Sequence, residues 1–143
     1  MRLGIFVVDD DADIREILRL LLEDAGYQVS EASDGATALR MLRKMNEPHV
    51  VLLDQCLPGL TGGSLLQTVA RDAALRSRHA YVLLTANTCT QAQQVVRNIP
   101  HLDVAVITKP FDMDNLLDTI SAVTFRLIGL PATLSGEQSQ PLA

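Results

Sequence analysis

Aromatic residues are scarce in this sequence, which has no tryptophan, two tyrosines and three phenylalanines. Proteins that bind single-stranded nucleic acid stack bases on aromatic side chains, so stacking has little to act on here. Basic residues are also outnumbered, because 12 lysines and arginines face 17 aspartates and glutamates, for a formal net charge of −5. That sign argues against non-specific binding to the phosphate backbone of nucleic acid.

Cysteines and long apolar runs are equally rare. Cys56 and Cys89 are the two cysteines, and no CxxC spacing joins them, which indicates reduced thiols and a cytoplasmic location. No apolar run approaches the length of about 20 residues that a membrane-spanning helix needs. Charged residues follow Met1 too soon for a secretory signal. We therefore expect no membrane contact.

The remaining composition is that of a globular domain. The 143 residues are 48% hydrophobic and 20% charged, enough for one domain with a proper core. After residue 127 the helical periodicity stops and the composition changes. We assign residues 1–127 to the domain and residues 128–143 to a tail or the start of a linker.

Short apolar runs rich in Val, Ile and Leu indicate the strands. They lie at residues 3–8, 50–53, 80–84 and 104–108, and they are typical of strands buried on both faces of a parallel sheet. Residues 27–32 alternate more and predict an edge strand.

Helical periodicity separates these strands. Asp13 and Glu16 predict a capping box at the first helix, and Gly26 predicts its end. The alternation of strands and helices predicts an α/β fold, a doubly wound five-stranded parallel sheet with helices on both faces. The helices are marked by Ile14, Ile17, Leu18 and Leu21; by Ala38, Met41, Leu42 and Met45; by Leu66, Val69, Ala70 and Ala73; by residues 90–99; and by Met113, Leu116, Leu117, Ile120 and Leu127.

Four of the predicted strands end in groups suited to phosphoryl chemistry. Asp9 and Asp10 follow the first run, Asp54 ends the next, and Thr85 and Lys109 end the last two. The carboxyl ends of parallel strands meet at one edge of the sheet, where ligands of such folds bind. The pattern indicates that an aspartate accepts a phosphoryl group with the help of a divalent cation.

The residue types fit that chemistry. A transferring phosphoryl group spreads negative charge over its oxygens, so its site must supply cations and hydrogen-bond donors. Mg²⁺ prefers carboxylate oxygens, water and phosphate, so we expect Asp10 and Asp54 as direct ligands and Asp9 as a ligand through water. Lys109 and the Thr85 hydroxyl would hold phosphoryl oxygens.

Taken singly, these residues have simpler structural roles as helix caps, strand residues or surface charges. We expect Asp11 and Asp13 to be caps and the isolated His49, His79 and His101 to be surface or strand-edge residues.

Four motifs together carry a family resemblance. VVDDD, LLDQCLPGLTG, LLTA and TKPF occur in the order and at the spacing of the response-regulator receiver domains of two-component signalling, and the chain resembles that family over residues 3–127. The resemblance implies the flavodoxin-like strand order 2-1-3-4-5.

The resemblance also implies a role for each matching position. Asp54 would be the phosphoacceptor, receiving its group from a phosphohistidine on a sensor histidine kinase or histidine phosphotransfer protein. Asp9 and Asp10 would form the acidic Mg²⁺ pocket with the backbone carbonyl of Cys56. The remaining positions would contact the phosphoryl group or shape its loop: Thr85, Ala86, Lys109 and Pro110, the last after a cis peptide bond.

Two positions depart from the common pattern of the family. Many members carry an aromatic switch residue three positions before the lysine, where this chain has Val106. Thr85 could still move toward the phosphate without that ring. Asn87 replaces an acidic residue of some relatives, which should alter the dephosphorylation rate.

Phosphorylation would change a protein-contact face made by residues 90–99, the fifth strand and the last helix.

Three other functions make different demands on the sequence. A phosphatase with an aspartyl nucleophile would want a second acid two residues beyond Asp54, where Cys56 stands. A flavodoxin-like cofactor carrier would need hydroxyl and glycine donors after the first strand, but three aspartates there repel a flavin phosphate. A degenerate receiver acting as a constitutive interaction module stays open, although none of the key acids is missing. We therefore expect a signalling domain and not an enzyme, with no direct binding of nucleic acid and an output that the sequence does not name.

Overall fold

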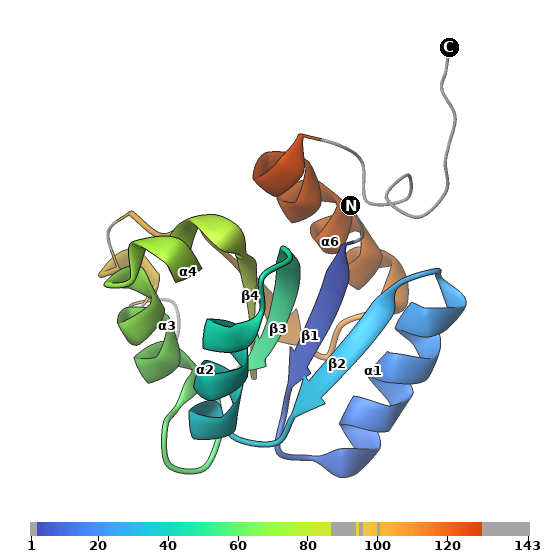
Figure 1. Ribbon diagram of the computed structural model, residues 1–143. Helices are drawn as coiled ribbons and strands as arrows, with labels where there is room; N and C mark the ends of the chain where they lie inside the picture. The colour runs from blue at the N-terminus through green and yellow to red at the C-terminus, as the bar shows by residue number, and fades with distance from the viewer. Residues whose placement is uncertain (1–2, 87–93, 95, 100, 130–143) are drawn as a thin grey trace.

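The computed structural model describes residues 3–86, 94, 96–99 and 101–129. Five parallel strands form one sheet in the order β2-β1-β3-β4-β5, so the predicted fold class and strand order are confirmed (Figure 1). The strands are β1 (Gly4–Val8), β2 (Gln28–Ala32), β3 (His49–Asp54), β4 (Ala80–Ala86) and β5 (Val104–Lys109). The helices are α1 (Ala12–Asp24), α2 (Gly35–Lys44), α3 (Gly62–Ala70), α4 (Ala73–Arg78) and α6 (Met113–Ile128).

The central strands are buried on both faces, as their apolar runs predict. Successive side chains of a strand point to opposite faces, so each strand contributes to two cores. Phe6, Val51 and Leu83 lie in one hydrophobic cluster, while their neighbours in sequence lie in the other. The second cluster contains these neighbours, which are Ile5, Val7, Val50, Leu52, Val82 and Leu84.

Helices cover both faces of the sheet, as predicted. One core contains Leu18 of α1 together with Leu116 and Ile120 of α6. The opposite core contains residues of α2, α3 and α4 (Figure 1). None of the described helices has the length and apolar character that a membrane span requires.

The N-cap of helix α1 lies two residues before the predicted one. Asp11 is the N-cap, and its carboxylate accepts hydrogen bonds from the N–H groups of Asp13 and Ile14. The expected capping box that starts at Asp13 is therefore wrong, because Asp13 lies in the first turn of the helix.

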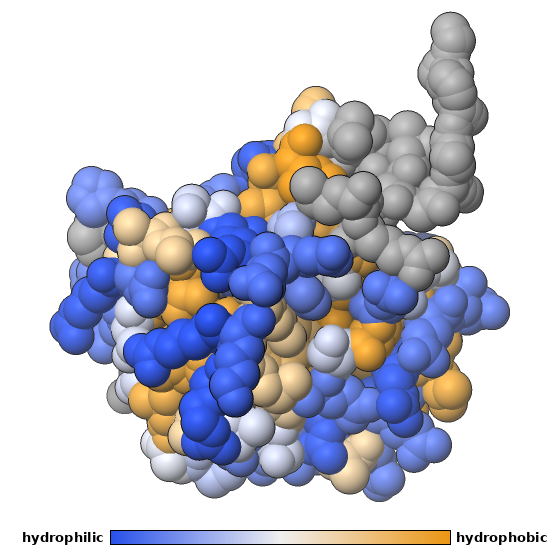
Figure 2. Space-filling model, in the orientation of Figure 1, coloured by the Kyte–Doolittle hydropathy of each residue, from blue (hydrophilic) through white to orange (hydrophobic). Residues whose placement is uncertain are grey.

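The buried face of α1 is also narrower than its apolar spacing predicts. Leu18 and Leu22 are buried, whereas Ile17, Leu20 and Leu21 are exposed. Apolar surface reaches the solvent at the right of the view, where α1 lies, and further apolar patches lie at the top and at the left (Figure 2). A groove is lined by this helix and by the segment after β5, through Ile14, Ile17, Leu18, Leu21, Lys109, Pro110, Phe111 and Met113.

The predicted third helix is two helices. Helix α3 ends at Ala70, and the carboxylate of Asp72 caps a new short helix that starts at Ala73. Gly62 and Gly63 are the first residues of α3. Half of the predicted helix at residues 90–99 lies outside the described residues, and of the described half residues 94, 96 and 97 are helical.

His79 is buried immediately before β4, so it matches the strand-edge alternative of the expectation and not the surface alternative. The residue is only 2% exposed, and its Nδ1 accepts a hydrogen bond of 3.1 Å from the backbone N–H of His49. His101 is exposed, as expected. Since His79 follows α4 directly and His49 begins β3, the hydrogen bond ties two elements together at the amino-terminal edge of the sheet.

Candidate functional site

The register of the sheet brings the predicted site residues to one edge. Asp9 directly follows β1, and Asp54 and Lys109 are the last residues of β3 and β5. Asp54 pairs with Leu84, so Thr85 lies one residue beyond it on β4. The predicted convergence of strand ends is confirmed for these residues.

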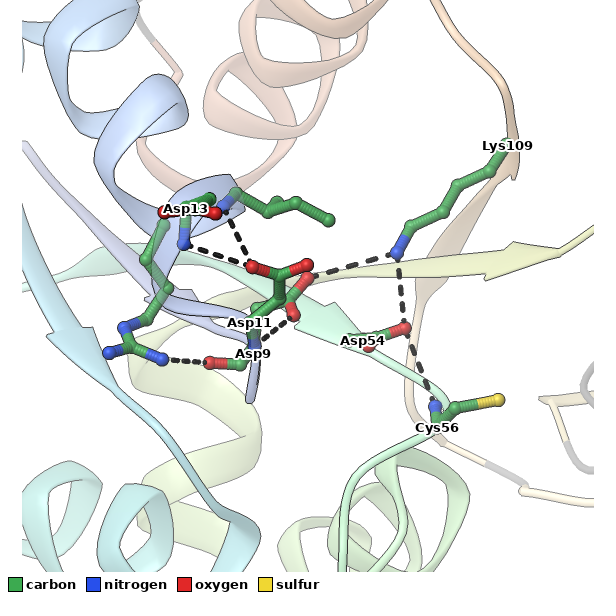
Figure 3. A network of polar contacts seen from close by, with 8 residues as sticks. Asp9, Asp11, Asp13, Asp54, Cys56 and Lys109 are labelled. Carbon is green, nitrogen blue, oxygen red and sulfur yellow. Dashed lines mark hydrogen bonds and ion pairs between the residues drawn. The ribbon is translucent and has the colours of Figure 1, made fainter.

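Lys109 joins the two buried carboxylates (Figure 3). Its Nζ lies 3.4 Å from Oδ1 of Asp54 and 3.7 Å from Oδ2 of Asp9. Both aspartates are buried, and the lysine is partly buried. The site therefore holds one cation reaching between two carboxylates in a region where charge is poorly screened.

Asp9, Asp10 and Asp54 form an acidic cluster that could hold a metal ion. One carboxylate oxygen from each can be chosen such that all three lie within 4.8 Å of one another. Burial raises the pKa of Asp9 above its ordinary value. The negative charge of Asp54 adds to this effect, while the hydrogen bond from Asp11 and the charge of Lys109 partly offset it. A divalent cation would relieve that repulsion.

One atom of this cluster lacks a hydrogen bond. Among the described residues no hydrogen-bond donor reaches Oδ2 of Asp9, which is buried and has Lys109 as its ion-pair partner at 3.7 Å. Buried polar oxygens are nearly always satisfied, so such an atom needs an explanation. Oxygen ligands of this kind are those that Mg²⁺ prefers, and the residues fit that ion.

Several hydrogen bonds fix the main chain of the cluster. The Asp11 N–H donates to Oδ1 of Asp9 at 2.9 Å, and the Asp9 N–H donates to the carbonyl of Ala32 in β2. Nη1 of Arg15 donates to the carbonyl of Asp9 at 2.7 Å. The sequence motifs did not point to Arg15, because its acceptor is a backbone carbonyl that no side-chain pattern reveals.

The loop after Asp54 is fixed mainly by Gln55. Its Oε1 accepts a hydrogen bond of 2.8 Å from the Gly63 N–H, and its carbonyl accepts one from Gly62. The Cys56 N–H lies 3.4 Å from Oδ1 of Asp54, and the Cys56 side chain is exposed (Figure 3). Gly62 lies so close to the chain that a Cβ there would be 2.6 Å from the Asp54 carbonyl. Gln55 is a second contributor that the motifs did not single out.

The other predicted positions lie near this edge. Thr85 is buried, and its hydroxyl is 3.4 Å from the carbonyl of the exposed Ala86. Val106 is partly buried on β5 opposite Leu83. The peptide bond between Lys109 and Pro110 is cis, as predicted. Asn87 lies outside the described residues.

Comparison with known proteins identifies the family. The family model described as response regulator receiver domain matches residues 5–121. The chain belongs to that family. Receiver domains of response regulators are signalling domains, and the predicted family resemblance is thereby confirmed.

Sequence relatives of this receiver domain are longer proteins. The DNA-binding response regulator MtrA of Mycobacterium tuberculosis is 34% identical over 122 residues, which are 85% of this chain and 50% of MtrA. The phosphate regulon transcriptional regulatory protein PhoB of Escherichia coli is 36% identical over 125 residues, 86% of this chain and 52% of PhoB. The chain thus spans about half the length of these relatives.

Solved receiver structures resemble the whole described domain. A CheY-like response regulator receiver domain protein from Methanospirillum hungatei has a TM-score of 0.70 and 31% identity, covering 89% of this chain and 95% of that one. The chemotaxis protein CheY4 of Vibrio cholerae has a TM-score of 0.75 and 28% identity, covering 86% and 99%. The receiver fold therefore extends over nearly all of both solved chains.

Proposed function

We propose that this receiver domain accepts a phosphoryl group on Asp54 from a phosphohistidine of a histidine kinase or phosphotransfer protein. The observation that carries the proposal is the Asp54 carboxylate, buried at the end of β3, with Lys109 Nζ at 3.4 Å and the acidic pair beside it. In the reaction an Asp54 oxygen attacks phosphorus, the phosphorus–nitrogen bond breaks, and the imidazole leaves with the bonding electrons. The product is an acyl phosphate.

Each neighbouring group has a proposed part in that step. Lys109 would pair with phosphoryl oxygens that carry negative charge in the transition state. The Thr85 hydroxyl, which now faces the Ala86 carbonyl, would move to donate to the same group. The exposed Ala86 leaves room for the phosphoryl group at the mouth of the site. Asn87 would set the rate at which water removes it.

A divalent cation completes the proposed site. Asp10, Asp54 and the backbone carbonyl of Cys56 would hold Mg²⁺, with Asp9 as a ligand through water. When bound, the ion neutralises charge on the carboxylates and on the phosphoryl oxygens. The buried Oδ2 of Asp9, to which none of the described residues donates a hydrogen bond, supports this assignment.

The domain would act as a switch and not as an enzyme with turnover. Phosphorylation would bias the segment after Thr85 and the β5 end, and so change the contact face of residues 90–99, β5 and α6. Residues 1–127 would form this unit, and a cytoplasmic location would give it access to its phosphoryl donor.

The experiment is intact mass spectrometry after incubation with acetyl phosphate, with and without Mg²⁺. The proposal predicts a gain of one phosphoryl group that requires Mg²⁺, is released by hydroxylamine and is lost in Asp54→Asn. Asp13→Asn is the matched control, because Asp13 is an exposed aspartate in the first turn of α1. A gain that persists in Asp54→Asn would contradict the proposal.

We also propose that the donor protein contacts the apolar groove beside Lys109. The exposed Ile17 of α1 lines this groove with Phe111, and both adjoin the segment that carries the lysine. Ile17→Glu should slow transfer from a phosphohistidine protein while leaving transfer from acetyl phosphate unchanged. Phe125→Glu, an equally exposed apolar position on α6, is the control. Equal slowing of both reactions by Ile17→Glu would contradict docking there.

A further inference from the structure

Each polar atom of Asp9 except one is fixed by a hydrogen bond. Its N–H donates to the Ala32 carbonyl at 3.1 Å, and its Oδ1 accepts from the Asp11 N–H at 2.9 Å. Its carbonyl accepts from Arg15 Nη1 at 2.7 Å. The remaining atom, Oδ2, is buried and has no hydrogen bond among the described residues, though Lys109 is near it.

Arg15 is itself held in place by Glu31 on the edge strand. Nε of Arg15 lies 3.1 Å from one carboxylate oxygen of Glu31, and Nη1 of Arg19 lies 3.1 Å from the other. The two arginines therefore share one partner but differ in a decisive way. Arg15 also reaches the Asp9 carbonyl and its side chain is 17% exposed, whereas that of Arg19 is 47% exposed.

We infer that Arg15, held by Glu31, is a positioning residue that sets the direction of the Asp9 carboxylate for binding a divalent cation. This inference rests on the proposed Mg²⁺ site. The guanidinium offers separate donors in a rigid fork, so one side chain can fix both a backbone carbonyl and a carboxylate. Partners one shell away from metal ligands orient those ligands, and their loss commonly weakens metal binding tenfold or more.

A merely structural ion pair makes a different prediction. An ion pair between Arg15 and Glu31 that served only to join α1 to β2 should affect stability and leave metal binding unchanged. Simple electrostatics predicts the opposite sign, because removal of a positive charge near the acidic cluster should strengthen binding of a cation. A weaker affinity on removal of Arg15 can therefore be separated from both explanations.

The test compares Mg²⁺ dissociation constants of the full chain by isothermal titration calorimetry. Arg15→Gln should bind Mg²⁺ about tenfold more weakly than the wild type, while Arg19→Gln should stay within about twofold because it leaves the Asp9 contact intact. Glu31→Ala, which releases Arg15, should weaken binding in the same direction as Arg15→Gln. Equal affinities of Arg15→Gln and Arg19→Gln, or tighter binding by Arg15→Gln, would overturn the inference.

Two further measurements keep the test decisive. Circular dichroism and urea unfolding establish that each variant folds. If Arg15→Gln does not fold, Arg15→Lys keeps the charge and the stem, and it should fold and bind Mg²⁺ more weakly than the wild type. Wild-type affinity in a folded Arg15→Lys would then overturn the inference. Absence of Mg²⁺ binding by the wild type would refute the proposed metal site itself, whereas equal binding by all variants would refute only the role of Arg15.

Discussion

Acidification should destabilise this domain through His79. The side chain is buried next to the start of β3, and its Nδ1 accepts a hydrogen bond of 3.1 Å from the His49 N–H. Burial lowers the pKa of His79 from its ordinary value of 6.5 to about 4, and the positive charges of His49 and Arg78 add to the shift. The native protein therefore keeps His79 neutral at pH values where an unfolded chain would protonate it.

The direction and the size of the change in the free energy of unfolding follow from the lowered pKa of His79. Well above pH 6.5 the imidazole is neutral in both the folded and the unfolded state, so it contributes no pH dependence there. As the pH falls from 6.5 to about 4, only the unfolded state takes up the proton, and the free energy of unfolding decreases. One pKa unit corresponds to about 1.4 kcal/mol, so a pKa lowered from 6.5 to about 4 gives a full loss of roughly 3–4 kcal/mol.

Urea unfolding followed by circular dichroism at several pH values between 7.5 and 4.5 measures this loss. Carboxylates titrate in the lower part of the window, so the quantity to compare is the difference between the wild type and His79→Asn. Asparagine keeps an acceptor for the His49 N–H but has no proton to gain. We expect the wild type to lose more stability on acidification than the variant. Parallel curves for the two proteins would refute the reasoning.

Three further substitutions test other contacts. Lys109→Gln should slow phosphorylation of Asp54 by acetyl phosphate about a hundredfold, measured by mass spectrometry. Its Mg²⁺ affinity, measured by calorimetry, should be equal to or higher than that of the wild type, because the variant removes a positive charge beside Asp9 and Asp54; loss of Mg²⁺ binding would contradict the assigned role. Gly62→Ala should destabilise the domain by about 1–3 kcal/mol, because its Cβ would lie 2.6 Å from the Asp54 carbonyl; an unchanged urea midpoint would show that α3 can shift freely. Asp72→Ala should cost about 1 kcal/mol in the same assay, because it removes the cap of α4, and an exposed Asp114→Ala serves as its comparison.

The sequence alone predicted the fold and the meeting point of the site residues well. Apolar runs and their polar ends are local signals, and the carboxyl ends of parallel strands meet by geometry. Asp9, Asp54 and Lys109 were therefore placed together from their positions after three runs, and the register of the sheet bears this out.

Features that depend on contacts between distant elements were predicted poorly. His79 has no neighbour in sequence that reveals its burial, which results from packing between the end of α4 and the start of β3. Arg15 binds a backbone carbonyl, which no pattern of side chains displays. Helix α1 carries apolar residues on more than one face. Their spacing alone therefore does not show which face packs on the sheet, and so does not show that Leu22 is buried and Ile17 is exposed.

The sequence also does not decide which aspartate caps helix α1. Asp11 and Asp13 both have side chains that can accept from a helix terminus, and only the backbone conformation decides between them. Asp11 has the extended conformation of an N-cap, with its carboxylate on the first free N–H groups. The split between α3 and α4 was missed similarly, because Asp72 was not recognised as a new cap.

The most direct test of the central claim is to locate the phosphoryl group in the chain. The protein is phosphorylated with acetyl phosphate and Mg²⁺, then treated with borohydride, which reduces an aspartyl phosphate to homoserine. Peptide mass spectrometry should find homoserine at position 54 and aspartate at positions 9 and 10. Homoserine at position 9 or 10, or a phosphoryl group on a hydroxyl or histidine side chain, would contradict the assignment of Asp54 as the phosphoacceptor.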